Sequence, residues 1–344
     1  MIDLRSDTVT LPTKEMKEFM FHAPLGDDVF GEDPSINTLQ EKASILFGKE
    51  AALFVPSGTM ANLISVLSHC DRGEEILLGN KSHIFKYEAG GTSVFGGVHS
   101  CQLHNNDNGT INIEDIIKNI RDNRDDHFPK TKLLCLENTH NFCYGSAIPE
   151  KYFNDVKKAI QPYNLKLHID GARIFNAATR LNCSVKSLAK AADSITFCLS
   201  KGLSCPSGSI ILGNSNFIKK ARRIRKSLGG GMRQAGILAS AGIFALDNMI
   251  QRLDQDHNNA NIIANELAKI QGLDIDINKI STNLVFFHLQ KEDLTDFDFL
   301  NQLLKNKIKI DSKGNRKFRI ATHSGFTSDM IDKVVHTIQI VLNN

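Results

Sequence analysis

The chain has 344 residues, of which 41% are hydrophobic and 23% are charged, and its formal net charge at pH 7 is +3. These values are typical of a globular protein with room for one large domain and a smaller one. So small a net charge gives no reason to expect a nucleic-acid partner. Residues 1–7 carry charges where a signal peptide needs an apolar stretch, and the longest apolar run, residues 235–246, is too short to span a bilayer.

The cysteines number seven, and none of them shows CxxC spacing. An odd count without that spacing favours reduced thiols over a disulfide framework or a zinc site. Together with the charged amino terminus, this pattern predicts a cytoplasmic protein with no membrane partner and no metal among its functional residues.

Short apolar strands alternate with helices through the first 250 residues. Strands are predicted at residues 51–55, 75–78, 132–136, 165–169, 195–199 and 209–212, and helices at 35–48, 59–69, 111–120, 149–160 and 214–226. This alternation predicts a doubly wound α/β domain with a mostly parallel sheet over residues 14–250. Residues 1–13 are predicted to form an extended arm, and the changed pattern after Gln251 predicts a smaller α+β domain at 251–344.

Two predicted strands end in side chains that can share a reaction. The strand at 165–169 leads into Asp170 and, three residues on, Arg173, while the strand at 195–199 is followed by Lys201. In an open parallel sheet, ligands bind outside the carboxyl ends of the strands, so these three side chains are expected to converge there. A lysine and an aspartate at one crevice suggest a Schiff base with pyridoxal phosphate, whose ring nitrogen the aspartate keeps protonated. An ordinary loop lysine is the alternative.

A turn of small residues at 56–62 leads into the helix that runs to residue 69. Free backbone N–H groups at a helix start suit a phosphate, Gly58 allows close approach, and Thr59 adds a hydroxyl. Strand–turn–helix junctions are common, so an ordinary junction is the alternative.

Several further polar residues have both a functional and a structural interpretation. His83, at a helix start, is suited to stacking on a flat ring or moving protons, although capping would also explain it. Arg319 lies inside an apolar strand, where its buried guanidinium must be paired, with a substrate carboxylate as a candidate. The arm residue Ser6 is a candidate contact to that carboxylate, with a solvated terminus as the alternative. The basic helix at 214–226 is interpreted as a solvated amphipathic face.

A set of motifs in order along the chain resembles the low-specificity L-threonine aldolases. The motifs are RSDTVT at 5–10, GDDVFGEDP at 26–34, PSGTMAN at 56–62, ENTHN at 137–141, HIDGARIFNA at 168–177, LSKGLSCPSG at 199–208, GGGMRQAG at 229–236 and RIATH at 319–323. The resemblance implies the aspartate aminotransferase type of fold and a pyridoxal phosphate enzyme that splits 3-hydroxy amino acids into glycine and an aldehyde. A β-eliminating lyase or hydroxymethyltransferase is the related alternative, and a non-catalytic binding protein is the third.

By this resemblance, the cofactor contacts fall on residues already singled out. Lys201 is the Schiff-base lysine, Asp170 holds the pyridine nitrogen, and Arg173 lies beside the ring and substrate. Gly58 and Thr59 match the phosphate positions.

The same resemblance adds roles that the residues alone do not suggest. His83 matches the ring-stacking histidine, and Ser6 and Arg319 match the contacts to the substrate carboxylate. Arg233 matches an arginine that reaches the phosphate of a neighbouring subunit, which implies a shared site in a homotetramer. His127 matches a histidine near the substrate hydroxyl, so His83 and His127 are both candidate bases.

Two positions depart from the family pattern. Phe30 stands where the family usually has tyrosine, which puts any hydroxyl contact at that position in doubt. The loop after ENTHN is lengthened by Phe142, Cys143 and Tyr144, which is expected to alter the mouth of the site.

Overall fold

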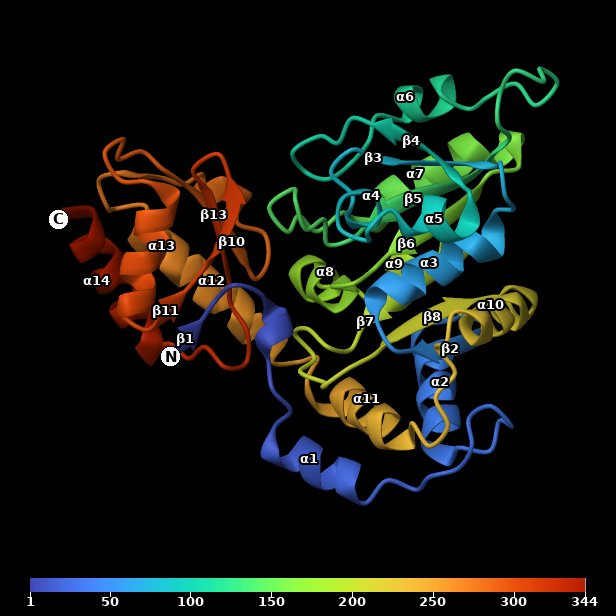
Figure 1. Cartoon of the computed structure of the whole chain (residues 1–344), viewed down its shortest axis with the longest axis horizontal. Coiled ribbons are helices and arrows are strands. Elements are labelled where there is room, and N and C mark those ends of the chain that lie inside the picture. Colours follow the sequence, from blue (N-terminus) through green and yellow to red (C-terminus); the bar gives the residue numbers. More distant parts are fainter. Residues whose placement is uncertain (344) are drawn as a thin grey trace.

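The computed structural model describes residues 1–343 as two lobes joined by the amino-terminal segment (Figure 1). The larger lobe holds a seven-stranded sheet in the order β2-β8-β7-β6-β5-β3-β4. Its strands are β2 (Ala51–Val55), β8 (Ser209–Gly213), β7 (Ser194–Cys198), β6 (Lys166–Asp170), β5 (Thr131–Glu137), β3 (Glu75–Gly79) and β4 (His99–Leu103). Only β8 runs antiparallel to its neighbours, so the predicted mostly parallel α/β sheet is confirmed.

Helices cover both faces of this sheet because alternate residues of each strand point to opposite sides. In β2, Ala52 and Phe54 join the main core with the helices α1, α2, α6, α7, α8, α9 and α11, while Leu53 and Val55 pack against α3 and α10. The bounds are α1 (Lys14–Phe21), α2 (Pro34–Phe47), α3 (Gly58–His69), α4 (His83–Lys86), α5 (Gly91–Gly96), α6 (Ile113–Lys118), α7 (Glu150–Ile160), α8 (Ile174–Leu181), α9 (Val185–Ala189), α10 (Ser215–Ser227) and α11 (Gly236–Asn248). Both strand faces are therefore apolar, as in other sheets with helices on each side.

The smaller lobe is built on an antiparallel four-stranded sheet in the order β12-β13-β10-β9. Its elements are α12 (Leu253–Leu267), β9 (Leu273–Asp274), β10 (Leu284–Leu289), α13 (Asp296–Lys305), β11 (Ile308–Lys309), β12 (Asp311–Gly314), β13 (Lys317–Ala321) and α14 (Asp329–Asn343). A separate apolar cluster fills this lobe, and the domain boundary near residue 251 stays a prediction. Among the helices of residues 1–343, none is long and apolar enough to cross a membrane.

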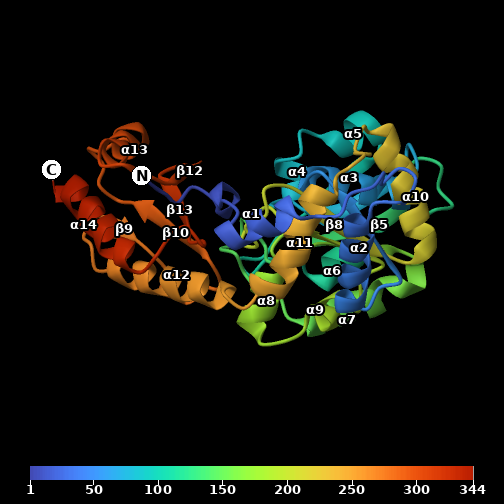
Figure 2. The same cartoon turned by 90° about the horizontal axis from the view of Figure 1, so that it is seen from below.

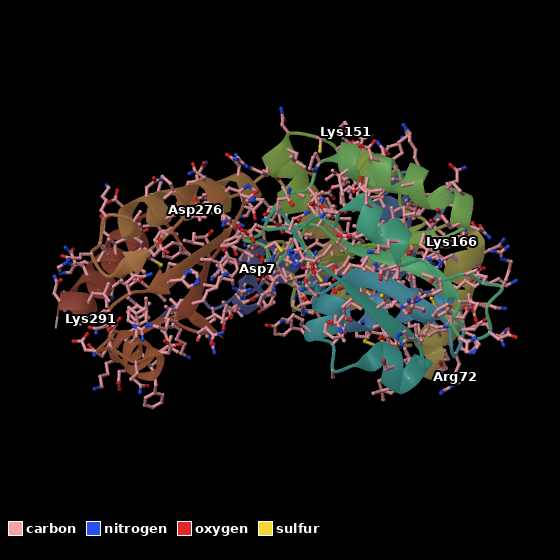
Figure 3. The ribbon with its side chains drawn as sticks, turned by 90° about the horizontal axis from the view of Figure 1, so that it is seen from above. Asp7, Arg72, Lys151, Lys166, Asp276 and Lys291 are labelled. Carbon is pink, nitrogen blue, oxygen red and sulfur yellow. The ribbon has the colours of Figure 1, made fainter. Side chains whose placement is uncertain are left out.

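The amino-terminal arm belongs structurally to the smaller lobe. Strand β1 (Ile2–Asp3) pairs in parallel with β11, and Leu4 is part of the smaller lobe's apolar cluster. A 3-10 turn at Asp7–Val9 then carries the chain toward the large lobe and α1. Figure 2 shows this segment between the two lobes, and Figure 3 shows Asp7 where they meet.

Two local predictions need correction. The basic helix α10 is not solvated throughout, because the Arg225 guanidinium is buried and paired with the Asp28 carboxylate at 2.5 Å. The helix predicted at 111–120 is shorter, because it spans only Ile113–Lys118.

Candidate functional site

A cavity of about 210 Å³ lies beyond the carboxyl ends of the large lobe's central strands. Asp170 is the last residue of β6, and Lys201 follows the end of β7 by three residues. Gly58, Thr59 and His83, all at helix starts that follow parallel strands, line the same cavity. The structure thus brings together five of the residues singled out from the sequence.

The carboxylate of Asp170 is held by two donors. Its Oδ1 accepts the backbone N–H of Ala172 at 3.0 Å, and its Oδ2 accepts the side-chain amide of Asn62 at 2.9 Å. Asn62 comes from α3, which lies on one face of the sheet. Asp170 is 3% exposed and lines the cavity, so its oxygens are positioned by protein groups and have little contact with bulk water.

The start of α3 offers an anion site with a tight backbone approach. Ser57 caps the helix by accepting the N–H of Met60 at 3.2 Å, and within residues 1–343 the N–H groups of Gly58 and Thr59 have no hydrogen-bond partner. A Cβ added at Gly58 would lie 2.8 Å from the sulfur of Cys198, so a larger residue would push the helix start away from β7. Free N–H groups at the positive end of a helix dipole suit a phosphate.

The imidazole of His83 is held by one carboxylate. Its Nδ1 lies 2.8 Å from Oε1 of Glu88, and its backbone N–H donates to Oε2 of Glu137 at 2.8 Å. Burial alone would lower the pKa of His83, but the hydrogen bond to Glu88 and the nearby charge of Asp170 outweigh it, so the pKa is raised. His83 therefore gains a proton more readily than a free histidine.

A second cavity, of about 170 Å³, shares Thr8, His83 and Lys201 with the first. Ser6, Arg173 and Arg319 line it, together with Tyr87, Asn141 and Lys313. Its walls come from the arm, the large lobe and the smaller lobe, so the predicted substrate contacts meet where the lobes join.

Arg173 makes a bidentate contact that the sequence interpretation did not include. Its Nε and a terminal nitrogen each lie 2.7 Å from an oxygen of Asp7, and both side chains are buried. Burial alone would raise the pKa of Asp7, but the charge and hydrogen bonds of Arg173 outweigh it and lower the pKa. This pair fastens the arm to the large lobe beside the second cavity.

Arg319 is nearly buried and partly paired. Its guanidinium donates to Oδ1 of Asn141 at 2.8 Å and to the carbonyl of Arg5 at 2.7 Å, and it lies 3.1 Å from Asp311. Its Nε has no hydrogen-bond partner in the part of the chain that the structure describes. An incompletely satisfied buried guanidinium on a cavity wall is suited to a planar carboxylate.

Two predicted residues lie outside both cavities of this chain. His127 is 91% exposed at its side chain and lies 2.7 Å from Asp125 in the loop before β5. Arg233 pairs with Asp27 at 2.9 Å, and its guanidinium lies 5.7 Å from the centre of the exposed Phe30 ring. Their functional roles stay predictions.

The lengthened loop after ENTHN reaches the second cavity through aromatic contacts. Phe142 stacks on Tyr87 with ring centres 5.1 Å apart, and Tyr87 stacks on His83 at 5.6 Å. Lys313 places its ammonium 5.6 Å from the centre of the Phe142 ring. Phe142 therefore packs behind Tyr87 and Lys313, which line the second cavity, and the effect of the lengthened loop on the mouth of the site stays a prediction.

Asp7, Asn62 and Glu88 were missed as functional candidates. Asp7 lies within RSDTVT and Asn62 closes PSGTMAN, so each belongs to a motif already singled out. Glu88 carries no such signal, because its proximity to His83 depends on how the chain bends after α4. Together with His83 and Asp170, Glu88 offers metal-ligand atoms within 4.8 Å, but these groups already hydrogen-bond one another or Asn62.

A family model described as beta-eliminating lyase matches residues 3–291. Low-specificity L-threonine aldolase 1 of Arabidopsis thaliana is 43% identical over 98% of this chain and 95% of its own length. The low specificity L-threonine aldolase of Escherichia coli K12 is 47% identical over 85% of this chain and 86% of its own. The chain belongs to the low-specificity L-threonine aldolases, within the beta-eliminating lyase family.

Solved structures agree with this threonine aldolase assignment at the level of fold. The threonine aldolase of Leishmania major superposes with a TM-score of 0.82 and covers 99% of this chain and all of its own, at 18% identity. A beta-eliminating lyase/threonine aldolase structure from Exiguobacterium gives a TM-score of 0.79 over 97% of this chain, at 17% identity.

The donor set fits pyridoxal phosphate, the cofactor that the resemblance implies. The cavity combines an amine at Lys201, a carboxylate at Asp170 and free N–H groups at a helix start, which match the aldehyde, ring nitrogen and phosphate. Gly58 and Thr59 both line this cavity, so their N–H groups are accessible to an anion there.

Proposed function

We propose that this chain cleaves L-threonine and L-allo-threonine to glycine and acetaldehyde with pyridoxal phosphate as cofactor. The observation that carries the proposal is the meeting of Lys201, Asp170 and His83 in one cavity, which adjoins a second cavity lined by Arg319 and Ser6. The similarity to the low-specificity L-threonine aldolases of Arabidopsis thaliana and Escherichia coli supports it.

Four sets of groups would hold the cofactor. Lys201 would bind the aldehyde, Asp170 the ring nitrogen, and the N–H groups of Gly58 and Thr59 the phosphate, while the His83 ring lies in the same cavity. When bound, pyridoxal phosphate supplies an aldehyde that condenses with amines and a ring that accepts electrons as a bond breaks.

The neighbouring cavity would orient the substrate. Arg319 and Ser6 would bind its carboxylate, which fixes how the Cα–Cβ bond points toward the cofactor. As that bond breaks, the hydroxyl proton must move to a base, and the hydroxyl-bearing carbon leaves as the aldehyde. A proton added to Cα then completes glycine.

His83 is the better placed of the two candidate bases within one chain. It lines both cavities, whereas the His127 side chain is 91% exposed and lies outside them. A base needs to be within hydrogen-bond reach of the proton that it removes.

We also infer a homo-oligomer, proposed as a homotetramer, whose sites two subunits share. Large apolar side chains are exposed on the arm, α1 and the loop after it, α2 and α11, namely Leu11, Phe19, Phe21, Leu25, Phe30, Ile45 and Ile237. The three helices pack together at one side of the large lobe (Figure 2). Large apolar side chains exposed on neighbouring elements suit burial against a second copy.

The test is product analysis with purified protein and pyridoxal phosphate. Glycine and acetaldehyde in equal amounts from L-threonine, without added tetrahydrofolate, are expected. Pyruvate and ammonia from serine, with no glycine from threonine, would favour the β-eliminating alternative and contradict the proposal. The Lys201→Ala protein is the control, because it keeps the cavity but lacks the amine.

A further inference from the structure

A buried carboxylate, Glu88, lies behind the imidazole of His83. Glu88 follows α4 in the chain and is 4% exposed. Its Oε1 is 2.8 Å from Nδ1 of His83 and accepts the side-chain amide of Asn62 at 2.8 Å. A carboxylate with so little access to water must be paired, and these two groups supply the pairing.

The amide of Asn62 holds Glu88 in one position. One N–H of that amide donates to Glu88 and one to Asp170, while its oxygen accepts from His168 at 3.2 Å and from Thr196 at 3.1 Å. Every hydrogen-bonding group of the side chain is thereby used. A different orientation of the amide would turn its oxygen toward two carboxylates, which cannot donate.

The neighbouring His168 completes this hydrogen-bond arrangement. Burial lowers the pKa of His168 to about 4, so the ring is neutral at physiological pH and has one N–H. That N–H is on Nε2, because the Asn62 oxygen that lies 3.2 Å from Nε2 can only accept. A fixed network therefore runs from His168 through Asn62 to Glu88 and His83.

We propose that Glu88 is a positioning residue that orients the His83 imidazole, holding its Nδ1–H and presenting its Nε2 to the substrate hydroxyl. Burial and the charge of Asp170 raise the pKa of Glu88, and the hydrogen bonds from His83 and Asn62 oppose that rise. In its ionised form the carboxylate can only accept, so the proton on that side of the ring belongs to Nδ1. Within residues 1–343 no group hydrogen-bonds to Nε2, and His83 lines both cavities. When Nε2 takes the hydroxyl proton, the carboxylate stabilises the imidazolium that forms.

The charged groups around His83 determine how far Glu88 alone can shift the pKa of the imidazole. The other titratable or charged groups at its ring or on the walls of the two cavities are Tyr87, Glu137, Asp170, Arg173, Cys198, Lys201, Lys313 and Arg319. Among residues 1–343, only Glu88 hydrogen-bonds to a ring nitrogen of His83, since Glu137 accepts the backbone N–H instead. Removing the charge of Glu88 should therefore lower the pKa of His83 more than removing the charge of Glu137.

The experiment compares Glu88→Gln with Glu137→Gln by NMR of histidine-labelled protein without cofactor. Wild-type His83, assigned by its absence in His83→Gln, is expected to titrate above its ordinary value. In Glu88→Gln the pKa of His83 should fall by about one unit or more, because a carboxylate in contact is lost. The Glu137→Gln protein should show a smaller shift.

Kinetics of the cofactor-loaded enzyme give a second readout. The acidic limb of kcat/KM for L-threonine should move to lower pH in Glu88→Gln, and kcat should fall at least about tenfold, since a positioned base contributes more than that. Glu88→Asp keeps the charge and should retain most of the pKa shift. If Glu88→Gln does not fold, the wild-type protein decides, because a His83 pKa at or below that of a free histidine contradicts the inference.

A His83 pKa that is the same in wild type, Glu88→Gln and Glu88→Asp would overturn the inference and leave Glu88 a structural residue. The inference rests on the proposed function for its substrate, yet the NMR titration needs neither cofactor nor substrate. A protein that shows the pKa shift but releases no glycine would therefore contradict the proposed function alone.

Discussion

Asp7 and Arg173 place two opposite charges out of contact with water, and each depends on the other. Replacing Asp7 with asparagine would leave the buried guanidinium without its counter-charge, so we expect Asp7→Asn to lower the free energy of unfolding by about 3–5 kcal/mol at neutral pH. Urea unfolding measures this loss. The Asp3→Asn protein is the control, because Asp3 pairs with the half-exposed Arg5 on the same arm and such pairs contribute little.

The same pair predicts a pH dependence with a definite sign. The pKa of Asp7 is lowered in the folded protein, so its contribution is present above the unfolded-state pKa and is lost as pH falls through the folded-state pKa. The difference in stability between wild type and Asp7→Asn should thus shrink as the pH falls below about 4, the ordinary aspartate value. A difference that stays constant in acid would show that the charge of Asp7 is not what stabilises the fold.

Asp33 connects the starts of two helices in the large lobe. Its oxygens accept the N–H of Ile36 in α2 at 3.0 Å, of Gly236 in α11 at 2.9 Å and of Gly26 at 3.2 Å. A Cβ at Gly236 would lie 2.4 Å from Oδ1 of Asp33, so the contact requires glycine there.

Asp33→Ala removes both acceptor oxygens and with them all three hydrogen bonds. The variant loses a helix cap and leaves buried N–H groups unpaired, and both changes destabilise the fold. We therefore expect a loss of about 2–4 kcal/mol in the free energy of unfolding. Asp33→Asn keeps one acceptor oxygen and should lose less. Thermal unfolding of both variants measures the two losses of stability. Equal losses would show that the number of acceptor oxygens at this position does not matter.

Elements with a strong local pattern could be predicted from the sequence, and those defined by distant partners could not. The β6 and β7 strands have short apolar runs followed by polar residues, so Asp170 and Lys201 were placed at strand ends. The reversed direction of β8 depends on how the chain returns after Lys201, which periodicity does not encode. For the same reason the sequence did not reveal that β1 pairs with β11 in the smaller lobe.

The candidate site likewise combines residues that local sequence patterns predict with residues that depend on distant partners. Residues at strand ends and helix starts could be predicted because their position in an α/β sheet is known once the strands are assigned. Asp7 and Glu88 could not, since their partners Arg173 and His83 lie on other segments and are reached only through the folded chain. Arg225 was misassigned because a basic helix gives no sign that a buried carboxylate, Asp28, faces one of its arginines.

At the scale of the whole molecule, the second cavity lies between two lobes and depends on the arm for closure. Asp7 contacts Arg173 of the large lobe and Asn283 of the smaller lobe, at 2.7 and 3.2 Å. Arg319 of the smaller lobe contacts Asn141 of the large lobe at 2.8 Å. These contacts fix the relative position of the groups proposed to bind the cofactor and the substrate carboxylate, which come from opposite lobes.

Arg233 provides a test of a site shared between subunits, because within one chain it contacts Asp27 and lines neither cavity. Lys201→Ala and Arg233→Ala proteins should each be inactive alone. Mixing them under conditions of subunit exchange should restore part of the activity, since some mixed dimers contain one site with both wild-type residues. Exchange verified by native mass spectrometry, with no recovery of activity, would argue against a shared site.

Lys201 is proposed to bind an aldehyde cofactor between the Asp170 carboxylate and the start of α3. Incubation with pyridoxal phosphate, reduction with borohydride and peptide mass spectrometry would locate the covalently fixed cofactor. Lys201 is expected to be the one modified residue. The modification should be lost when inorganic phosphate in excess competes for the start of α3. Modification of a different lysine under the same conditions, with Lys201 unmodified, would contradict this proposal.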